Sequence, residues 1–155
     1  MSTIETLMAT DMISATPDEN VLMVADRMAR NRVGAVVVLD GERLAGIFSE
    51  RDLLNRVIGA QRDLRATRVG DVATLDVVTI DAEQPVRSVV DTFRARRFRH
   101  LPVVRDGRLV GILSTRDFLA FVVEGLERYV EKARYDQELA AGTDPYDHIG
   151  GSYGR

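Results

Sequence analysis

Two stretches of nine residues carry the same polar side chains in the same order. Residues 46–54 read GIFSERDLL and residues 111–119 read GILSTRDFL, at an offset of 65. Serine and arginine side chains donate hydrogen bonds to phosphate, and a carboxylate accepts both hydrogen bonds of a ribose diol. The pattern therefore indicates a duplicated site of nucleotide type. Its polar residues are Ser49, Arg51, Asp52, Ser114, Arg116 and Asp117.

The same residues also suit a purely structural role. Ser49 and Ser114 stand where a strand is expected to end and a helix to begin, and a serine there caps the first helical turn. The aspartates three positions later fit the acidic half of a capping box. The start of a helix also attracts phosphate, because its N–H groups are free and its dipole end is positive. Both interpretations stay open, but the recurring arginine favours the ligand site, because capping does not use it.

The duplication extends well beyond these nine residues. At offset 65, residues 11–14 align with residues 76–79. Near residue 33 the best offset becomes 66, so that Asp40-Gly41 aligns with Asp106-Gly107, before the offset returns to 65. We therefore expect two homologous repeats with a one-residue slip in the middle.

Each copy is expected to fold as β-α-β-β-α. A β-prone run precedes a helix with apolar residues at helical spacing, and two strands joined by an Asp-Gly hairpin lead into a second helix. The expected strands are residues 12–15, 35–39 and 43–49, then 77–80, 101–104 and 108–114. The expected helices are residues 21–31 and 85–97, with further helices opening at Glu50 and Thr115. A repeat of about 60 residues covers its own sheet poorly, so we expect an α+β fold with the two repeats packed sheet to sheet.

The duplication also suggests how the chain is divided. Repeat one is expected at residues 1–62, repeat two at 63–128, and a C-terminal extension at 129–155. The helix at the end of repeat two continues into the extension with apolar residues at helical spacing. Residues 142–155 are rich in glycine and have no period. We expect this tail to be flexible, or ordered only by a partner.

Composition narrows the classes of function. The 155 residues are 45% hydrophobic and 29% charged, which is typical of a globular protein. Without cysteine, disulfides and thiolate metal sites are excluded, and the lack of a secretory signal or apolar membrane span favours a cytoplasmic protein. The net charge of −3 argues against nucleic-acid binding. The sequence shows no glycine-rich phosphate loop and no recurring nucleophile–base pair, so no enzyme is expected.

A basic run at residues 94–100, RARRFRH, has three interpretations. Its arginines, which suit the negative dipole end of a helix, are Arg94, Arg96, Arg97 and Arg99. Alternatively, Arg99 and His100 lie beside a bound phosphate. A nucleic-acid patch is the third interpretation, which an acidic chain supports poorly. His148 has no second histidine near it in the sequence, so no metal site is expected.

With these features the chain resembles a tandem pair of CBS domains, the regulatory module named after cystathionine β-synthase. The matching features are the β-α-β-β-α order, the apolar strand before Asp-Gly, and the ending Gly-h-x-Ser-x-x-Asp, where h is hydrophobic. The resemblance implies two repeats related by a pseudo-twofold axis, with two clefts that take adenosine-containing ligands such as AMP, ADP, ATP, NAD or S-adenosylmethionine. It also implies a homodimer, and an adenine nucleotide that acts as a regulatory ligand rather than as a required cofactor.

The resemblance assigns residues of both repeats to each cleft. The first would combine Ser49, Arg51, Asp52, Val77, Val78, Thr79, Arg99, His100 and Leu101. The second, with fewer cations, would combine Ser114, Arg116, Asp117, Met12, Ile13, Ser14, Val33, Gly34 and Ala35. In each cleft the aspartate would hold the ribose, the serine would lie beside the phosphate, and the strand residues would flank the adenine.

Two functions stay open on this basis. In the first, the chain is a stand-alone sensor: an adenosine-containing ligand changes its shape or dimer state, and an unknown partner protein responds. In the alternative, the chain is a dimerisation module with vestigial clefts, and the Ser–Asp pairs are only helix caps.

Overall fold

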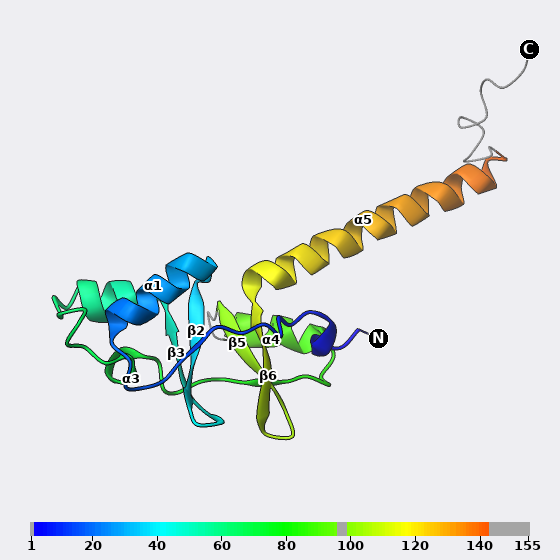
Figure 1. The fold of residues 1–155 in the computed structure, drawn as a ribbon. Helices are drawn as coiled ribbons and strands as arrows, with labels where there is room; N and C mark the ends of the chain where they lie inside the picture. The colour runs from blue at the N-terminus through cyan, green and yellow to red at the C-terminus, as the bar shows by residue number, and fades with distance from the viewer. Residues whose placement is uncertain (1, 96–98, 143–155) are drawn as a thin grey trace, which may run out of the picture. The chain divides into compact units, whose positions relative to one another are not determined.

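The structure is a computed structural model that describes residues 2–95 and 99–142 (Figure 1). It is an α+β fold, as predicted. The elements of the first repeat are a 3-10 turn η1 (Ile4–Thr6), β1 (Ser14–Ala15), α1 (Val21–Asn31), β2 (Ala35–Asp40), β3 (Arg43–Ser49), α2 (Glu50–Asp52) and a π-helical turn η2 (Leu53–Ile58). They are followed by α3 (Val69–Val72), β4 (Ile80–Asp81), α4 (Arg87–Ala95), β5 (His100–Arg105), β6 (Arg108–Ser114) and α5 (Thr115–Ala140). The chain divides into two compact units, residues 1–117 and 118–155, each described by itself.

Each repeat forms one three-stranded sheet, with the order β1-β2-β3 in the first and β4-β5-β6 in the second. The first strand of each sheet is parallel to the second, and the second is antiparallel to the third. Val38 lies opposite Gly46 and Val103 lies opposite Gly111, so the offset between the repeats is 65 through both hairpins. The predicted slip to an offset of 66 is therefore wrong.

The two Asp-Gly pairs occupy different places in their hairpins. In the first hairpin Asp40 is the last paired residue of β2, and Gly41 opens the loop with a φ of 63°. In the second, Asp106 and Gly107 form the loop, with φ values of 50° and 74°. A two-residue hairpin loop needs a positive φ at its first position, which glycine or aspartate can adopt. An alignment of the two Asp-Gly pairs by sequence is therefore shifted by one residue from the alignment of the two hairpins by strand pairing.

The outer strands are shorter than predicted, since β1 covers two residues rather than 12–15 and β4 covers two rather than 77–80. In the first sheet the N–H of Val37 donates to the C=O of Ile13 at 3.3 Å. The equivalent residue in the second sheet is Pro102, which has no N–H to donate. Pairing of the second outer strand therefore begins one residue later, at Ile80.

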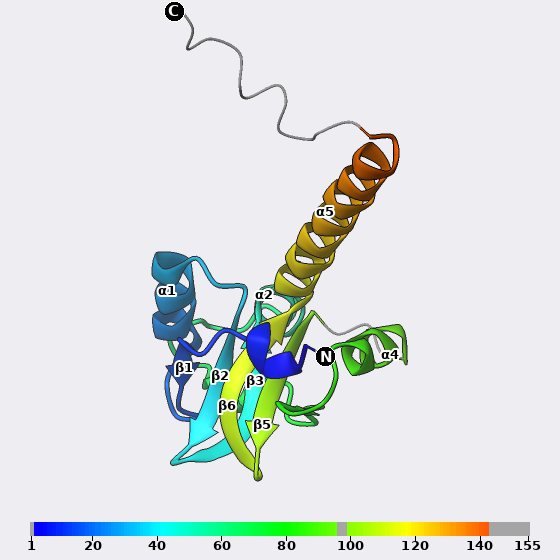
Figure 2. The same ribbon diagram turned by 90° about the vertical axis from the view of Figure 1, so that its right-hand side faces the viewer.

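Helix α1 begins and ends at the predicted residues. Its N-cap Asn20 accepts a hydrogen bond from the N–H of Met23 at 2.9 Å, and its buried residues Val24 and Met28 pack in the core of the first sheet. Helix α4 begins at Arg87, later than predicted, and its predicted last residues lie outside the described part of the chain. Figure 2 shows the strands of both sheets between α1 and α4.

Each sheet is extended by a segment from the beginning of the other repeat. Ala9 exchanges backbone hydrogen bonds with Ile112 of β6 at 2.9 and 3.0 Å. Thr74 exchanges them with Ile47 of β3 at 2.8 and 2.9 Å. The two pairs of residues are equivalent at offset 65, so both segments pair with the sheet of the other repeat in the same way. Strands β3 and β6, with which they pair, also contact each other.

Packing therefore crosses the predicted boundary between residues 62 and 63. Val69 and Val72 of α3 are buried in the core of the first repeat. Ile4 is fully buried, and its N–H donates to the C=O of Gln84 in the second repeat at 3.0 Å. The boundary itself stays a prediction that rests on the duplication.

The helix that opens at Glu50 is only one α-helical turn before it widens into η2, where the N–H of Gly59 donates to the C=O of Leu54 at 2.7 Å. Helix α5 is much longer, with 26 residues. Within the described part of the chain, no helix is both long enough and apolar enough to cross a membrane. Beyond Gly142, the tail predicted to be flexible lies outside the described residues.

Candidate functional site

Two cavities lie within residues 1–117, and each combines residues of both repeats. The first, called the Asp52 cavity, has a volume of about 250 Å³. Its lining residues are Gly34, Ile47, Ser49, Glu50, Arg51, Asp52, Thr74, Asp76, Val77, Val78, Arg99 and His100. The second, called the Asp117 cavity, has a volume of about 650 Å³. Its lining residues are Ala9, Asp11, Met12, Ile13, Arg32, Val33, Gly34, Ala35, Val37, Glu50, Arg99, His100, Ile112, Ser114, Thr115, Arg116 and Asp117.

Three predicted site residues line neither cavity, namely Ser14, Thr79 and Leu101. Each directly follows a residue that does line one, and successive side chains along extended backbone point to opposite faces. Leu101 accordingly points into the core, where it has no exposed surface. The side chains of these three residues therefore face away from the cavities, and their assignment to the clefts stays a prediction.

Several lining residues are absent from the predicted set. Asp11 and Asp76 are equivalent residues of the two repeats, one in each cavity, and their match at offset 65 is a signal that could have found them. Arg32 reaches the Asp117 cavity from the left-handed C-cap of α1, with a φ of 53°. Thr74 reaches the Asp52 cavity from the segment paired with β3. Arg32 recurs at offset 65 as Arg97, a signal that could have found it, whereas the residue equivalent to Thr74 is Ala9, so no duplicated polar pair marks Thr74.

The two cavities share a wall of four residues, which are Gly34, Glu50, Arg99 and His100. Arg99 and His100 line the cleft predicted for them and Gly34 lines its predicted cleft, but each of the three also lines the other cavity. A Cβ on Gly34 would lie 3.5 Å from Oε2 of Glu50 and 3.6 Å from Cε1 of His100, so the glycine leaves room for both side chains. The N–H of Glu50 donates to the C=O of Gly34 at 3.0 Å, and Thr115 donates in the same way to Arg99 at 2.9 Å.

Charge is mixed in both cavities. Three arginines and three carboxylates line the Asp117 cavity, and two arginines and three carboxylates line the Asp52 cavity. The expectation that the Asp117 cleft has fewer cations is wrong, because Arg32 and Arg99 join it. No cluster of three or more His, Asp or Glu side chains that could hold a metal ion occurs among the described residues.

His100 is a neutral group in the shared wall. Burial lowers the pKa of its imidazole, and the nearby guanidinium of Arg99 lowers it further. The carboxylates of Glu50 and Asp117 act in the opposite direction but do not compensate for burial. Since the usual value is already 6.5, the ring is uncharged at neutral pH, and a neutral imidazole has one hydrogen-bond donor and one acceptor to offer to the cavities.

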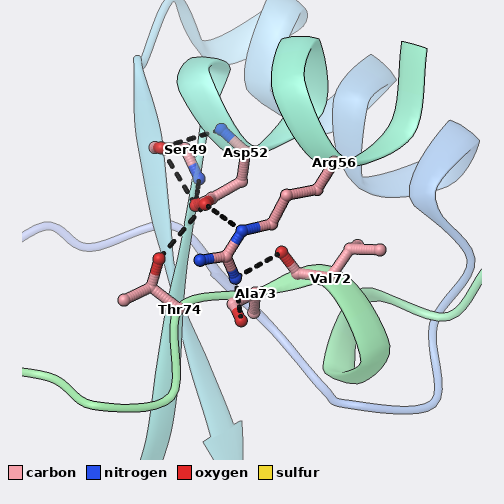
Figure 3. A network of polar contacts seen from close by, with 6 residues as sticks. All are labelled: Ser49, Asp52, Arg56, Val72, Ala73 and Thr74. Atoms are coloured by element: carbon pink, nitrogen blue, oxygen red, sulfur yellow. Dashed lines mark hydrogen bonds and ion pairs between the residues drawn. The ribbon is translucent and has the colours of Figure 1, made fainter. Parts of the chain in front are cut away.

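The Asp52 carboxylate lies at the centre of a polar network (Figure 3). Its Oδ2 accepts hydrogen bonds from the N–H and the hydroxyl of Ser49 at 2.9 and 3.0 Å, which completes a capping box. Its Oδ1 accepts a hydrogen bond from the hydroxyl of Thr74 at 3.1 Å and lies 3.6 Å from Nε of Arg56. Asp52 is buried, with 6% of its surface exposed.

The equivalent Asp117 has a much simpler environment. Its Oδ2 accepts a hydrogen bond from the hydroxyl of Ser114 at 2.6 Å, and its own N–H donates to that hydroxyl at 3.1 Å. The residue is exposed. Within the described part of the chain, no hydrogen bond or ion pair holds its Oδ1. The predicted helix cap is therefore present in both repeats, but the buried network surrounds only Asp52.

Comparison with known proteins identifies the family. The model of the CBS domain family matches residues 4–59 and 69–124. The chain therefore belongs to the CBS domain family and contains two CBS domains in tandem, as the resemblance predicted.

Relatives and solved structures agree with this assignment. A mitochondrial CBS domain-containing protein of Arabidopsis thaliana is 34% identical over 70% of this chain, and the match spans 55% of that protein, about half its length. A CBS-domain containing protein of Agrobacterium tumefaciens is 30% identical, with a TM-score of 0.71 over 77% of this chain and 98% of its own. A CBS domain protein of Pyrobaculum aerophilum, solved in complex with AMP, is 30% identical, with a TM-score of 0.69 over 75% of this chain and 89% of its own.

Proposed function

We propose that this chain is a regulatory module that binds adenosine-containing nucleotides between its two CBS repeats and signals by a change of shape or dimer state. The observation that carries the proposal is that each cavity joins the Ser-x-Arg-Asp residues of one repeat to the first-strand segment of the other. The AMP complex of the Pyrobaculum aerophilum relative supports the same ligand class. The proposed role is regulatory and includes no reaction.

The lining residues suit the three parts of such a ligand. An aspartate accepts the hydrogen bonds of the ribose diol, and serine and arginine side chains donate to the phosphate. The apolar segments at residues 12–13 and 77–78 would contact the adenine ring and offer backbone groups to its edge. A cavity of about 300–1,000 Å³ is usual for small-molecule ligands, and the Asp117 cavity lies in that range.

A thermal-shift series with AMP, ADP, ATP, NAD and S-adenosylmethionine, and with guanine nucleotides as controls, tests this proposal. A ligand at 100 times its Kd stabilises a protein by about 2.7 kcal/mol per site. In a domain of this size that corresponds to a rise in Tm of about 2–4 °C for each kcal/mol. We expect adenine compounds alone to raise the Tm, and the rise to be lost in an Asp52→Ala/Asp117→Ala variant. A variant that responds as strongly as wild type would contradict the proposal.

Helix α5 supports a second proposal, that the chain forms a homodimer through this helix. Leu119 and Leu126 are spaced by seven residues, and with Tyr129 they are exposed by 62%, 59% and 71%. Such spacing on one face is typical of helices that pair. Consider two copies of the helix that lie antiparallel with Tyr129 of one opposite Val130 of the other. Glu127 then lies opposite Lys132, and Arg128 lies opposite Glu131, so both pairs have opposite charges. The helix is thus complementary to a second copy of itself.

Light scattering after size exclusion checks the homodimer. We expect wild type at twice the mass of the chain, and we expect Leu126→Glu to shift the population to monomer, because it places a charge on the apolar face. Leu54→Glu is the control, since Leu54 is a leucine of η2 that is also exposed, by 62%. A monomeric wild type, or a dimeric Leu126→Glu variant, would contradict pairing through α5.

A further inference from the structure

The two cavities differ in what surrounds the aspartate of each. Resting on the proposed function, we propose that the nucleotide binds in the Asp117 cavity, and that Arg56 and Thr74 hold Asp52 as a structural carboxylate. On this assignment the two copies of the motif differ in role. One copy binds the ligand, and in the other the aspartate stabilises the fold.

The Asp52 carboxylate has its acceptor positions filled within its own chain. A carboxylate offers about four lone-pair sites. Two are taken by the N–H and hydroxyl of Ser49, one by the hydroxyl of Thr74, and Arg56 pairs with the same oxygen as Thr74. A ribose diol would have to displace Thr74 and Arg56 before its own hydroxyls could donate to Oδ1.

Arg56 is held at both sides of its guanidinium. While Nε faces Asp52, Nη1 donates to the C=O of Ala73 at 2.9 Å and lies 3.4 Å from the C=O of Val72 (Figure 3). The side chain therefore joins the carboxylate to the backbone just before Thr74. Moving Arg56 aside would break these contacts together and leave a buried carboxylate without its cation, which is costly.

The second repeat has no counterpart of Arg56 or Thr74. At offset 65, the residue equivalent to Thr74 is Ala9 and the residue equivalent to Arg56 is Phe121. Neither of these side chains carries a hydrogen-bond donor. Asp117 therefore keeps an exposed oxygen that can accept from a diol without displacing a partner in the described structure.

Cavity size and charge favour the same assignment. The Asp117 cavity has about 650 Å³ and the Asp52 cavity about 250 Å³. Arg32 and Arg116 line the larger cavity in addition to the shared Arg99. The smaller cavity has only Arg51 and the shared Arg99, against three carboxylates, the same number of carboxylates as in the larger cavity. A phosphate is therefore better balanced in the Asp117 cavity, because unlike charges attract it and like charges repel it.

Isothermal titration calorimetry of the full chain with AMP tests the assignment. We expect one AMP per chain in wild type and about tenfold weaker binding, or none, in Asp117→Asn. Arg56→Gln combined with Thr74→Ala frees the Asp52 carboxylate, so this variant is expected to bind two AMP molecules per chain. Adding Asp117→Asn to that pair should return the number to one. Two AMP molecules of equal affinity in wild type, or unweakened binding in Asp117→Asn, would overturn the assignment and leave the proposed function standing.

Urea unfolding without nucleotide tests the structural half of the proposal independently. We expect Asp52→Asn to lower the urea midpoint clearly more than Asp117→Asn does, because only Asp52 is buried and fully paired. Thr74→Ala removes one of these contacts and gives a milder variant in case Asp52→Asn does not fold. Equal midpoints for the two asparagine variants would overturn the structural role of Asp52. If wild type binds no adenosine compound, the proposed function fails. The urea comparison still decides whether Asp52 stabilises the fold.

Discussion

His100 shows how one residue can connect two sites. It lies in the wall common to both cavities, close to Glu50 on one side and within the field of Asp117 on the other. Because its ring is uncharged at neutral pH, it adds no cation to either cavity there. Acidification would protonate it, and that charge would act on both cavities at once.

Protonation of His100 also predicts how stability depends on pH. Its pKa in the folded chain is lower than the usual 6.5, so between the two values the unfolded chain binds more protons than the folded chain. Stability should therefore fall as the pH is lowered through that range. We expect urea midpoints measured from about pH 7.5 to about pH 5.5 to decline less in His100→Asn than in wild type. An unchanged slope in His100→Asn would contradict the argument.

At the scale of elements, the glycine at the start of each Gly-h-x-Ser-x-x-Asp motif leaves room for a backbone segment of the other repeat to pass close to the strand. A Cβ on Gly46 would lie 2.8 Å from the C=O oxygen of Thr74, and a Cβ on Gly111 would lie 2.9 Å from that of Ala9. Real Cβ contacts with backbone are not that short. The motif glycine therefore has a structural reason that is separate from ligand binding: it lets the segment from the other repeat pair with the strand.

Gly46→Ala is accordingly expected to destabilise the protein. Overpacking against fixed backbone typically costs about 1–3 kcal/mol. The matched control is Gly125→Ala in α5, where, apart from the adjacent residues and the helix's own backbone, no atom lies within 4 Å of the added Cβ, and alanine favours the helix by about 1 kcal/mol. Thermal unfolding should thus show a lower Tm for Gly46→Ala and no loss for Gly125→Ala. A Gly46→Ala variant as stable as wild type would mean that the crossing segment can shift aside.

At the scale of the whole molecule, the two repeats depend on each other's leading segments. The first residues of the chain pack on the second repeat through Ile4, and α3 packs on the first repeat through Val69. The segment that holds Ile4 is therefore part of a core. We infer that neither repeat folds fully without the first segment of the other.

Ile4→Ala tests this dependence. Ile4 has no exposed surface, and truncation of a buried isoleucine typically costs about 2–5 kcal/mol. Ile58→Ala is the control, because Ile58 is 51% exposed, and it should cost far less. The measurement is the free energy of unfolding in urea for both variants. Similar small losses in the two variants would show that the N-terminal segment contributes little to the second repeat.

Much of this fold could be predicted because its signals are local. The bounds of α1 and the two hairpins follow from residues near one another in the chain, through helical spacing, alternation and turn residues, and the repeat follows from matching residues at a fixed offset. The family resemblance assigned Ser49, Asp52 and their equivalents to the clefts, and these residues line the two cavities, although their role in binding stays a prediction. It was less accurate wherever side-chain direction mattered, as at Leu101, because a run of letters does not say which face each residue takes.

By itself, then, the sequence determined that there are two copies of one unit and which polar residues recur in them. Only the tertiary structure decided what surrounds each copy. Asp52 receives Thr74 from 22 residues away, the Asp117 cavity receives Arg32 from the end of α1, and both cavities receive His100 through a shared wall. The physical reason is that these partners come from segments brought together by strand pairing across the repeats. The identical motif residues Asp52 and Asp117 therefore have different surroundings.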